Sequence, residues 1–150
     1  MSTPATPPAA ALRDEMRAAL PRLRAIAEDR SLESRGDGKW VRREILGHLL
    51  DSAANNHQRF VRARFSNPFV WPGYEQDAWV SAHAYHTRPW QHLVDLWAAM
   101  NEQVAAAMES VPLECYATTC IIGDAEPASL EWWMRDYVRH LRHHLQQIVD

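Results

Sequence analysis

The feature that most constrains this chain is a long stretch of helical periodicity between residues 40 and 65, which contains no proline and only one glycine. Its inward positions recur every three or four residues, as they do on one face of an α-helix. They are Val41, Ile45, His48, Leu49, Ser52, Asn56 and Phe60. The sequence therefore predicts a long amphipathic helix, with His48 facing the interior among aliphatic neighbours. On its solvated side we expect the arginines Arg42, Arg43, Arg62 and Arg64.

Three further segments carry the same helical period, at residues 9–29, 87–111 and 128–149. Pro21 lies inside the first and is expected to kink or divide it, because proline removes a helical hydrogen bond. A run rich in β-branched residues between 113 and 127 favours a short strand or an extended segment. Four helices with two longer connections predict an all-α fold, a four-helix bundle, whose ligand sites form between facing helices.

Length and composition favour one ordinary domain. The chain has 150 residues, of which 47% are apolar and 23% charged, so it can bury a stable core without disulfide bonds. We expect residues 1–8, rich in proline, threonine and alanine, to form a flexible tail, and residues 9–150 to form a single domain. Cys115 and Cys120 lack the spacing of a redox or zinc-ribbon site and are expected to be buried or incidental thiols.

The charge balance bears on the partners of the protein. A net charge of −3 does not favour a positively charged binding surface, so neither nucleic acid nor a membrane is an expected partner. No run approaches the ~18 apolar residues of a membrane span. The first residues lack the basic and apolar regions of a signal peptide, so we expect a cytoplasmic location.

An aromatic-rich connection joins the second and third predicted helices, between residues 67 and 89. A loop of this length in a compact domain is usually functional or tightly packed. We expect it to be irregular and to pack down as a lid over one end of the bundle. Trp71, Tyr74 and Trp79 would then close over a substrate pocket.

Three of the eight histidines lie within five positions near the end of the chain. His140 and His144 are four residues apart and share one helix face, which is how a helix offers two imidazoles to one metal ion. His48 is the candidate third ligand. Three neutral imidazoles with open positions are typical of a catalytic site and suit zinc, nickel, copper or ferrous iron. His143 lies about 100° round the helix from His144 and is expected to pack or hydrogen-bond instead.

Simpler explanations stay open for these residues. His48 alone could be a hydrogen-bonded core histidine, and the other two could form a histidine-rich helix end that faces solvent. Asp51 and Asp136 could orient a ligand ring or hold the metal's water, or they could be surface carboxylates in ion pairs. A carboxylate-bridged pair of metals is not expected, because no glutamate lies three positions before His48 or His140.

Three segments resemble the DinB/YfiT-like superfamily. Residues 40–52 are similar to its first-histidine helix, residues 136–148 to its closing His-x-x-x-His helix, and residues 71–79 to the linker. The resemblance implies a four-helix bundle of up-down-down-up order. It implies one divalent metal, often nickel or zinc, bound by His48, His140 and His144. It also implies a metal-dependent hydrolase or a transferase that uses a low-molecular-weight thiol, and a homodimer.

The leading hypothesis is therefore a metal-dependent enzyme. A nickel, zinc or iron ion would activate water or a low-molecular-weight thiol toward an electrophilic small-molecule substrate, with Asp51 as a supporting carboxylate. The first alternative is a non-catalytic four-helix bundle that binds a metal or a small ligand. The second is a metal-free bundle whose histidines are merely packed.

Overall fold

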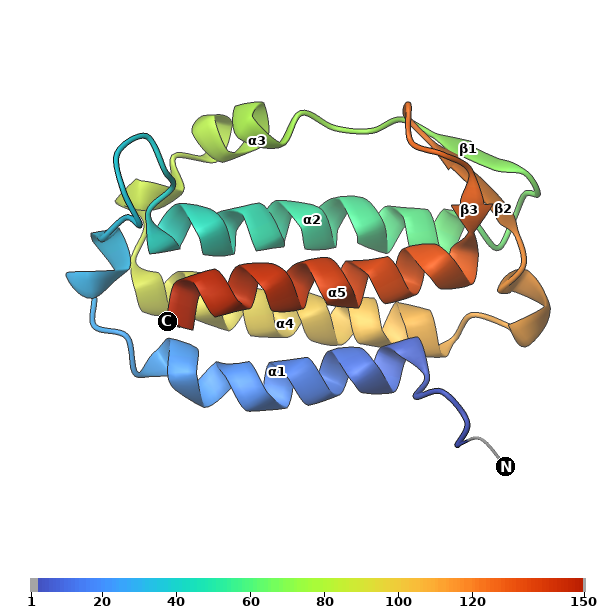
Figure 1. Cartoon of the computed structure of the whole chain (residues 1–150), viewed down its shortest axis with the longest axis horizontal. Coiled ribbons are helices and arrows are strands. Elements are labelled where there is room, and N and C mark those ends of the chain that lie inside the picture. The colour runs from blue at the N-terminus through green and yellow to red at the C-terminus, as the bar shows by residue number, and fades with distance from the viewer. Residues whose placement is uncertain (1–2, 150) are drawn as a thin grey trace.

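The computed structural model describes residues 3–149, and four long helices form its body (Figure 1). They are α1 (Pro8–Arg24), α2 (Arg42–Arg62), α4 (Trp90–Glu109) and α5 (Leu130–Val149). Both α1 and α2 contact α4 and α5, so the order around the bundle is α1, α4, α2, α5. In Figure 1, α2 and α4 run in one direction, and α1 and α5 run in the other. The predicted four-helix bundle of up-down-down-up order is confirmed.

The core lies between the apolar stripes of these four helices. Each stripe contributes large side chains that are completely shielded from solvent. They include Leu12 and Leu23 of α1, Leu46, Leu49 and Phe60 of α2, Trp90, Leu93, Trp97 and Met108 of α4, and Leu130, Met134 and Leu141 of α5. Each buried side chain of this size stabilises the fold by roughly 1.5–3 kcal/mol relative to exposure, which makes the bundle a firm scaffold for a site between its helices.

The first helix is shorter than predicted. It continues through Pro21 but ends at Arg24, where the N–H of Ala25 bonds to the carbonyl of Pro21 and the N–H of Ile26 bonds to the carbonyl of Leu23. The chain then makes a short 3-10 helix, η1 (Arg30–Leu32), and an antiparallel bridge between Ser34 and Val41. This connection leads directly into α2.

The aromatic connection is more ordered than the irregular loop predicted for it. It contains the strand β1 (Phe69–Trp71), the helix α3 (Gln76–His83) and the 3-10 helix η2 (Tyr85–Thr87). β1 pairs in parallel with β2 (Thr119–Ile122). The loop prediction is wrong because the partner that orders β1 lies far away in the sequence, within the segment that was itself predicted to be extended.

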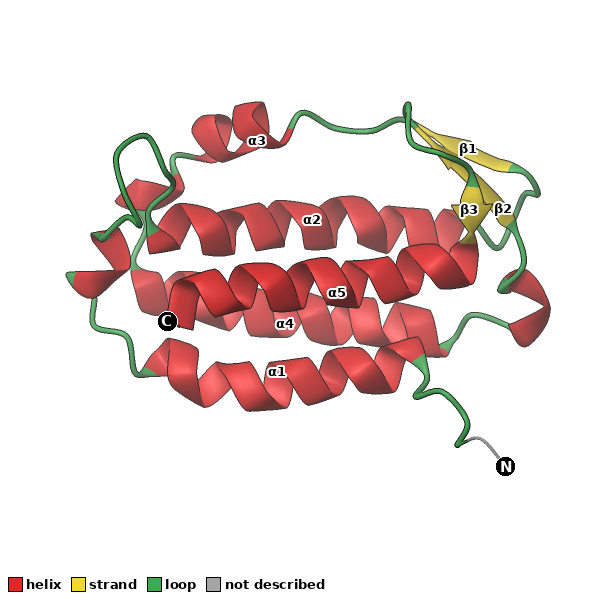
Figure 2. Ribbon diagram, viewed as in Figure 1, coloured by secondary structure: helices red, strands yellow, loops and turns green. Residues whose placement is uncertain are grey.

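The small sheet and α3 occupy different places on the bundle. β2 follows the 3-10 helix η3 (Leu113–Cys115) and also pairs antiparallel with β3 (Ala128–Ser129), so the strand order is β1-β2-β3. Figure 2 shows the sheet over one end of the bundle, while α3 lies along the side of α2 nearer the other end. The aromatic connection therefore spans the length of α2, and its helix covers that flank.

Arg43 was expected on the solvated side of α2, and this expectation is wrong. The residue is buried, and its guanidinium donates to the Ser31 hydroxyl at 2.7 Å, the Glu28 carboxylate at 2.9 Å and the His86 carbonyl at 3.1 Å. The helical period places Arg43 outside the bundle, but the two connections that flank α2 fold over it. Arg43 thereby ties both connections to the start of α2.

Among the described residues, no helix combines the length and the apolar character that crossing a membrane requires.

Candidate metal centre

The three predicted ligand histidines meet between α2 and α5. Each offers a ring nitrogen within 4.8 Å of those of the other two, and within residues 3–149 no other group of three such side chains is gathered in this way. His48 projects from α2 with 1% of its surface exposed. His140 and His144 project from consecutive turns of α5 and are half-buried. The four-residue spacing of His140 and His144 therefore places both side chains on the inward face of α5.

The ring geometry fits one metal ion. The Nε2 atoms of His48 and His140 are 3.2 Å apart. The three ring centroids lie 4.5 to 5.0 Å from one another, with interplanar angles of 77° to 79°, so the rings meet nearly at right angles. Two imidazole nitrogens on a tetrahedral zinc ion are about 3.3 Å apart, given Zn–N distances of 2.0–2.1 Å. The observed pair of nitrogens needs almost no movement to bind such an ion.

All three imidazoles are held in their neutral form. Burial, together with the neighbouring histidines, lowers the pKa of His48 to about 3 and that of His140 to about 4. Burial also lowers the pKa of His144, although its hydrogen bond to Gln147 acts in the opposite direction. Neutral imidazole carries the lone pair that binds a metal. The centre is therefore a set of three nitrogen donors at neutral pH.

Gln147 fixes the orientation of one donor and was missed from the sequence. Nδ1 of His144 lies 2.8 Å from Oε1 of Gln147, which can only accept, so Nδ1 carries the proton and Nε2 keeps the lone pair. A ligand histidine commonly has such a partner on its other nitrogen. The signal for Gln147 in the sequence was its position three residues after His144. The same amide lies 3.4 Å from Nε2 of the exposed His143.

The environment of His48 is different. The ring of Trp40 lies 5.1 Å from that of His48 and covers it from the start of α2. Nδ1 of His48 is buried and has no hydrogen-bond partner among the described residues. Packing by Trp40 therefore covers this ring, its Nε2 lies in 3.2 Å contact with Nε2 of His140, and no hydrogen bond at Nδ1 from the described residues fixes it.

Asp51 is buried but directed toward other partners. Its Oδ1 accepts a 2.6 Å hydrogen bond from the Tyr85 hydroxyl and lies 3.1 Å from Nδ1 of His83, which is itself 3.0 Å from the Trp79 carbonyl. Its Oδ2 is buried and has no hydrogen-bond partner in the part of the chain that the structure describes. Burial raises the pKa of Asp51, while Tyr85 and His83 oppose that rise. The sequence indicated Asp51 but not Tyr85, because their contact joins α2 to η2.

Asp136 lies on α5 one turn before His140 and forms an ion pair with Arg139, in which the atoms are 2.7 Å apart. Its charge acts on His140 by raising that residue's pKa, a smaller effect than the burial that lowers it. The carboxylate thus belongs to a surface ion pair at the edge of the centre.

The three aromatic residues assigned to a pocket lie in different places. Tyr74 lines a hollow beside His140. Trp79 packs edge-on against Tyr74, with ring centroids 5.4 Å apart. Trp71 instead stacks on Phe69 of the same strand and lies under the guanidinium of Arg62.

Two hollows flank the histidine cluster. One, of 320 Å³, has Trp40, Asp77, His144 and Gln147 on its wall. The other, of 170 Å³, has Ser52, Asn56, Arg59, Tyr74, Trp133, Asp136, Tyr137 and His140 on its wall. Each contains one of the α5 histidines, so the centre can be approached from two sides. The second hollow includes Arg59, which was not singled out from the sequence.

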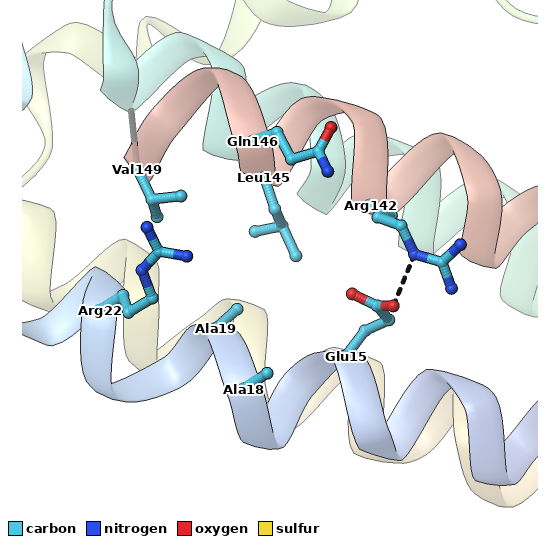
Figure 3. Close-up of a pocket in the computed structure, with 8 residues that line it drawn as sticks. All are labelled: Glu15, Ala18, Ala19, Arg22, Arg142, Leu145, Gln146 and Val149. Atoms are coloured by element: carbon cyan, nitrogen blue, oxygen red, sulfur yellow. Dashed lines mark hydrogen bonds and ion pairs between the residues drawn. The ribbon is translucent and has the colours of Figure 1, made fainter.

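A third hollow lies between α1 and α5 and takes no part in this centre (Figure 3). It measures 180 Å³, and none of the three histidines lines it. Half of the residues on its wall have small or apolar side chains, namely Ala18, Ala19, Leu145 and Val149. The charged pair that crosses it, Arg142 and Glu15, is already joined at 2.6 Å.

Comparisons with known proteins agree with this architecture. YfiT from Bacillus subtilis, described as a probable metal-dependent hydrolase with an unusual four-helix bundle topology, superimposes with a TM-score of 0.81 at 22% identity; the match covers 94% of this chain and 81% of that one. A mycothiol-dependent maleylpyruvate isomerase gives a TM-score of 0.75 at 11% identity, and the match covers 94% of this chain but only 59% of the isomerase. At these identities, both show a shared fold.

No curated protein matches the sequence of the chain. The model of the DinB superfamily matches residues 9–148, which is nearly the whole chain. The resemblance predicted from the sequence is therefore confirmed, and the chain belongs to the DinB superfamily.

Proposed function

We propose that the protein is a metal-dependent enzyme that binds one divalent ion through His48, His140 and His144. The observation that carries the proposal is the convergence of three neutral imidazoles within 4.8 Å, on two facing helices of a rigid bundle. Nickel, zinc and ferrous iron all suit three imidazole donors. When bound, such an ion supplies Lewis acidity, which lowers the pKa of a coordinated water or thiol and makes it a nucleophile at neutral pH.

The protein's own residues would prepare the reaction. Burial keeps the three imidazoles neutral, and Gln147 holds His144 with its Nε2 toward the cluster. We propose that Asp51, one turn after His48, accepts a proton through its unpartnered Oδ2. A pKa raised by burial makes it a stronger base than an exposed aspartate.

The substrate would be a small electrophile that enters through one of the two hollows. Tyr74 lines the hollow that contains His140, and Trp79 packs edge-on against Tyr74. Because the two hollows share no lining residue and each includes a different histidine of α5, one would admit a thiol or water while the other holds the electrophile. This division accommodates either a hydrolase or a thiol S-transferase.

Turnover by the metal-loaded protein tests the proposal. Protein without a histidine tag is loaded with zinc or nickel and offered monochlorobimane with low-molecular-weight thiols, beside a panel of esters and amides. We expect a saturable rate in one arm and its loss in His48→Ala, because that variant removes the most deeply buried ligand.

The matched control is His57→Ala, which alters another histidine of α2 outside the cluster. Equal rates for the wild type and His48→Ala would overturn the assignment of the site. A protein that binds the ion but shows no rate above His48→Ala in any arm would be a non-catalytic binder.

A further inference from the structure

Arg59 is a buried cation without a charged partner. The residue is 7% exposed, and among the described residues no carboxylate lies within ion-pair distance of its guanidinium. Within residues 3–149, its Nε has no hydrogen-bond partner, and Nη1 makes only a long contact of 3.4 Å with Oδ1 of Asn56. Arg43 of the same helix, equally buried, is satisfied by an ion pair and three further hydrogen bonds.

This arrangement is unfavourable for the protein alone. A buried charge is normally paired, because removing it from water without compensation is expensive. Burial lowers the pKa of Arg59, yet a guanidinium stays protonated at physiological pH. The free N–H groups of Arg59 therefore keep their charge and their capacity to donate.

The unpartnered guanidinium lies in the hollow that contains His140. Its Cζ atom lies over the rings of both Tyr74 and Trp133, 5.9 Å from each ring centroid. Burial raises the pKa of Tyr74, so its hydroxyl keeps its proton and can donate. The hollow thus presents a fixed cation and a neutral donor beside one of the proposed metal ligands.

We propose that Arg59 binds a carboxylate of the substrate and so places the substrate's reactive group beside the histidine cluster. The role of Arg59 in placing a substrate for reaction rests on the proposed function. The planar fork of a guanidinium matches a carboxylate with two parallel hydrogen bonds. A single cation and the nearby Asp136, on the wall of the same hollow, favour a monoanion over a doubly charged phosphate. The substrate class is therefore an electrophilic carboxylic acid.

Equilibrium binding of two isosteric probes tests this site without turnover. Benzoate and neutral benzamide are titrated into the untagged protein, with and without zinc, by calorimetry. We expect benzoate to bind the wild type more tightly than benzamide. Arg59→Gln should weaken benzoate binding by about tenfold to a hundredfold, as loss of a charge-assisted hydrogen-bond pair requires, and leave benzamide unchanged. Arg59→Lys, which keeps the charge, should retain part of the preference.

The matched control is Arg62→Gln, an exposed arginine one turn further along α2, which should leave both affinities unchanged. Circular dichroism establishes that each variant is folded. Three results would overturn the proposal. They are equal affinities of the wild type for benzoate and benzamide, equal losses of benzoate affinity in Arg59→Gln and Arg62→Gln, and tighter binding of phenylphosphonate than of benzoate. In metal-free His48→Ala, benzoate binding should persist, so failure of the metal site and failure of the anion site give different results.

Discussion

The hydroxyl of Tyr85 donates a 2.6 Å hydrogen bond to Oδ1 of Asp51 and thereby joins η2 to the middle of α2. Both side chains are buried. The ring of Tyr85 also stacks on His83, with centroids 4.9 Å apart, and His83 approaches the same carboxylate oxygen. This contact fixes the flank of α2 that bears the proposed metal ligand His48.

Removal of the Tyr85 hydroxyl should destabilise the fold. Tyr85→Phe leaves one oxygen of a buried carboxylate with a single partner, so we expect a loss of about 1–3 kcal/mol in the free energy of unfolding. Urea denaturation followed by circular dichroism measures it. Tyr116→Phe, at a half-buried tyrosine, is the control and should cost less than about 0.5 kcal/mol. Equal losses in the two variants would show that the Asp51 contact contributes nothing.

Gly47 is required by the same ring. A Cβ atom at this position would lie 2.0 Å from Cδ2 of Tyr85, so Gly47→Ala must displace the ring and its bond to Asp51. We expect a loss of about 2–4 kcal/mol despite the better helix propensity of alanine. The control is Gly73→Ala, whose added Cβ meets nothing closer than 3.9 Å. Thermal unfolding compares the two, and a Gly47→Ala protein as stable as wild type would contradict the packing described.

Stability of the metal-free protein should depend on pH through the histidine cluster. An unfolded histidine has a pKa near 6.5, whereas the folded pKa is about 3 for His48 and about 4 for His140. Between these values the unfolded chain binds protons that the folded chain does not. Stability is therefore full above the unfolded pKa and falls as the pH drops, by up to about 1.4 kcal/mol per pH unit for each histidine.

Urea denaturation in the presence of a chelator at several pH values between 7 and 4.5 measures this slope. His48→Asn removes one titrating group and should give a shallower dependence. Asp51, whose pKa is raised, acts in the opposite sense and contributes equally to both proteins. Identical slopes for the variant and wild type would mean that His48 does not titrate as its burial requires.

Gln147 should tune metal affinity without being a ligand. Gln147→Met removes the acceptor for Nδ1 of His144, so the ring can rotate or change tautomer. Loss of such an orienting partner typically weakens metal binding by about 10–100-fold. Competition with a chromophoric chelator gives the affinity. Gln146→Met, at the exposed neighbouring position, is the control; a similar weakening in both would exclude the orienting role.

The helices and the three histidines could be predicted from the sequence because both depend on local spacing. The period of α2 and α5 determines which side chains face inward, and a four-residue interval determines that His140 and His144 share a face. The same rule placed His48 inside. The helix ends were less accurate, as α1 shows at Arg24, because they depend on caps and connections.

The residues that prediction missed depend on contacts between distant segments. Arg43 was placed in solvent because the helical period does not include the connections that fold over it. The strand β1 could not be predicted without its partner β2. Arg59 became notable only when the structure showed it buried without a carboxylate, a property that the sequence does not encode locally.

The most direct test of the account is calorimetric titration of zinc into metal-stripped protein without a histidine tag. We predict one ion bound per chain in the wild type, no stoichiometric binding in His48→Ala, and unchanged binding in the control His57→Ala. A His48→Ala protein that still binds one ion with wild-type affinity, or a wild type that binds none, would contradict the assignment of His48, His140 and His144 as a metal centre.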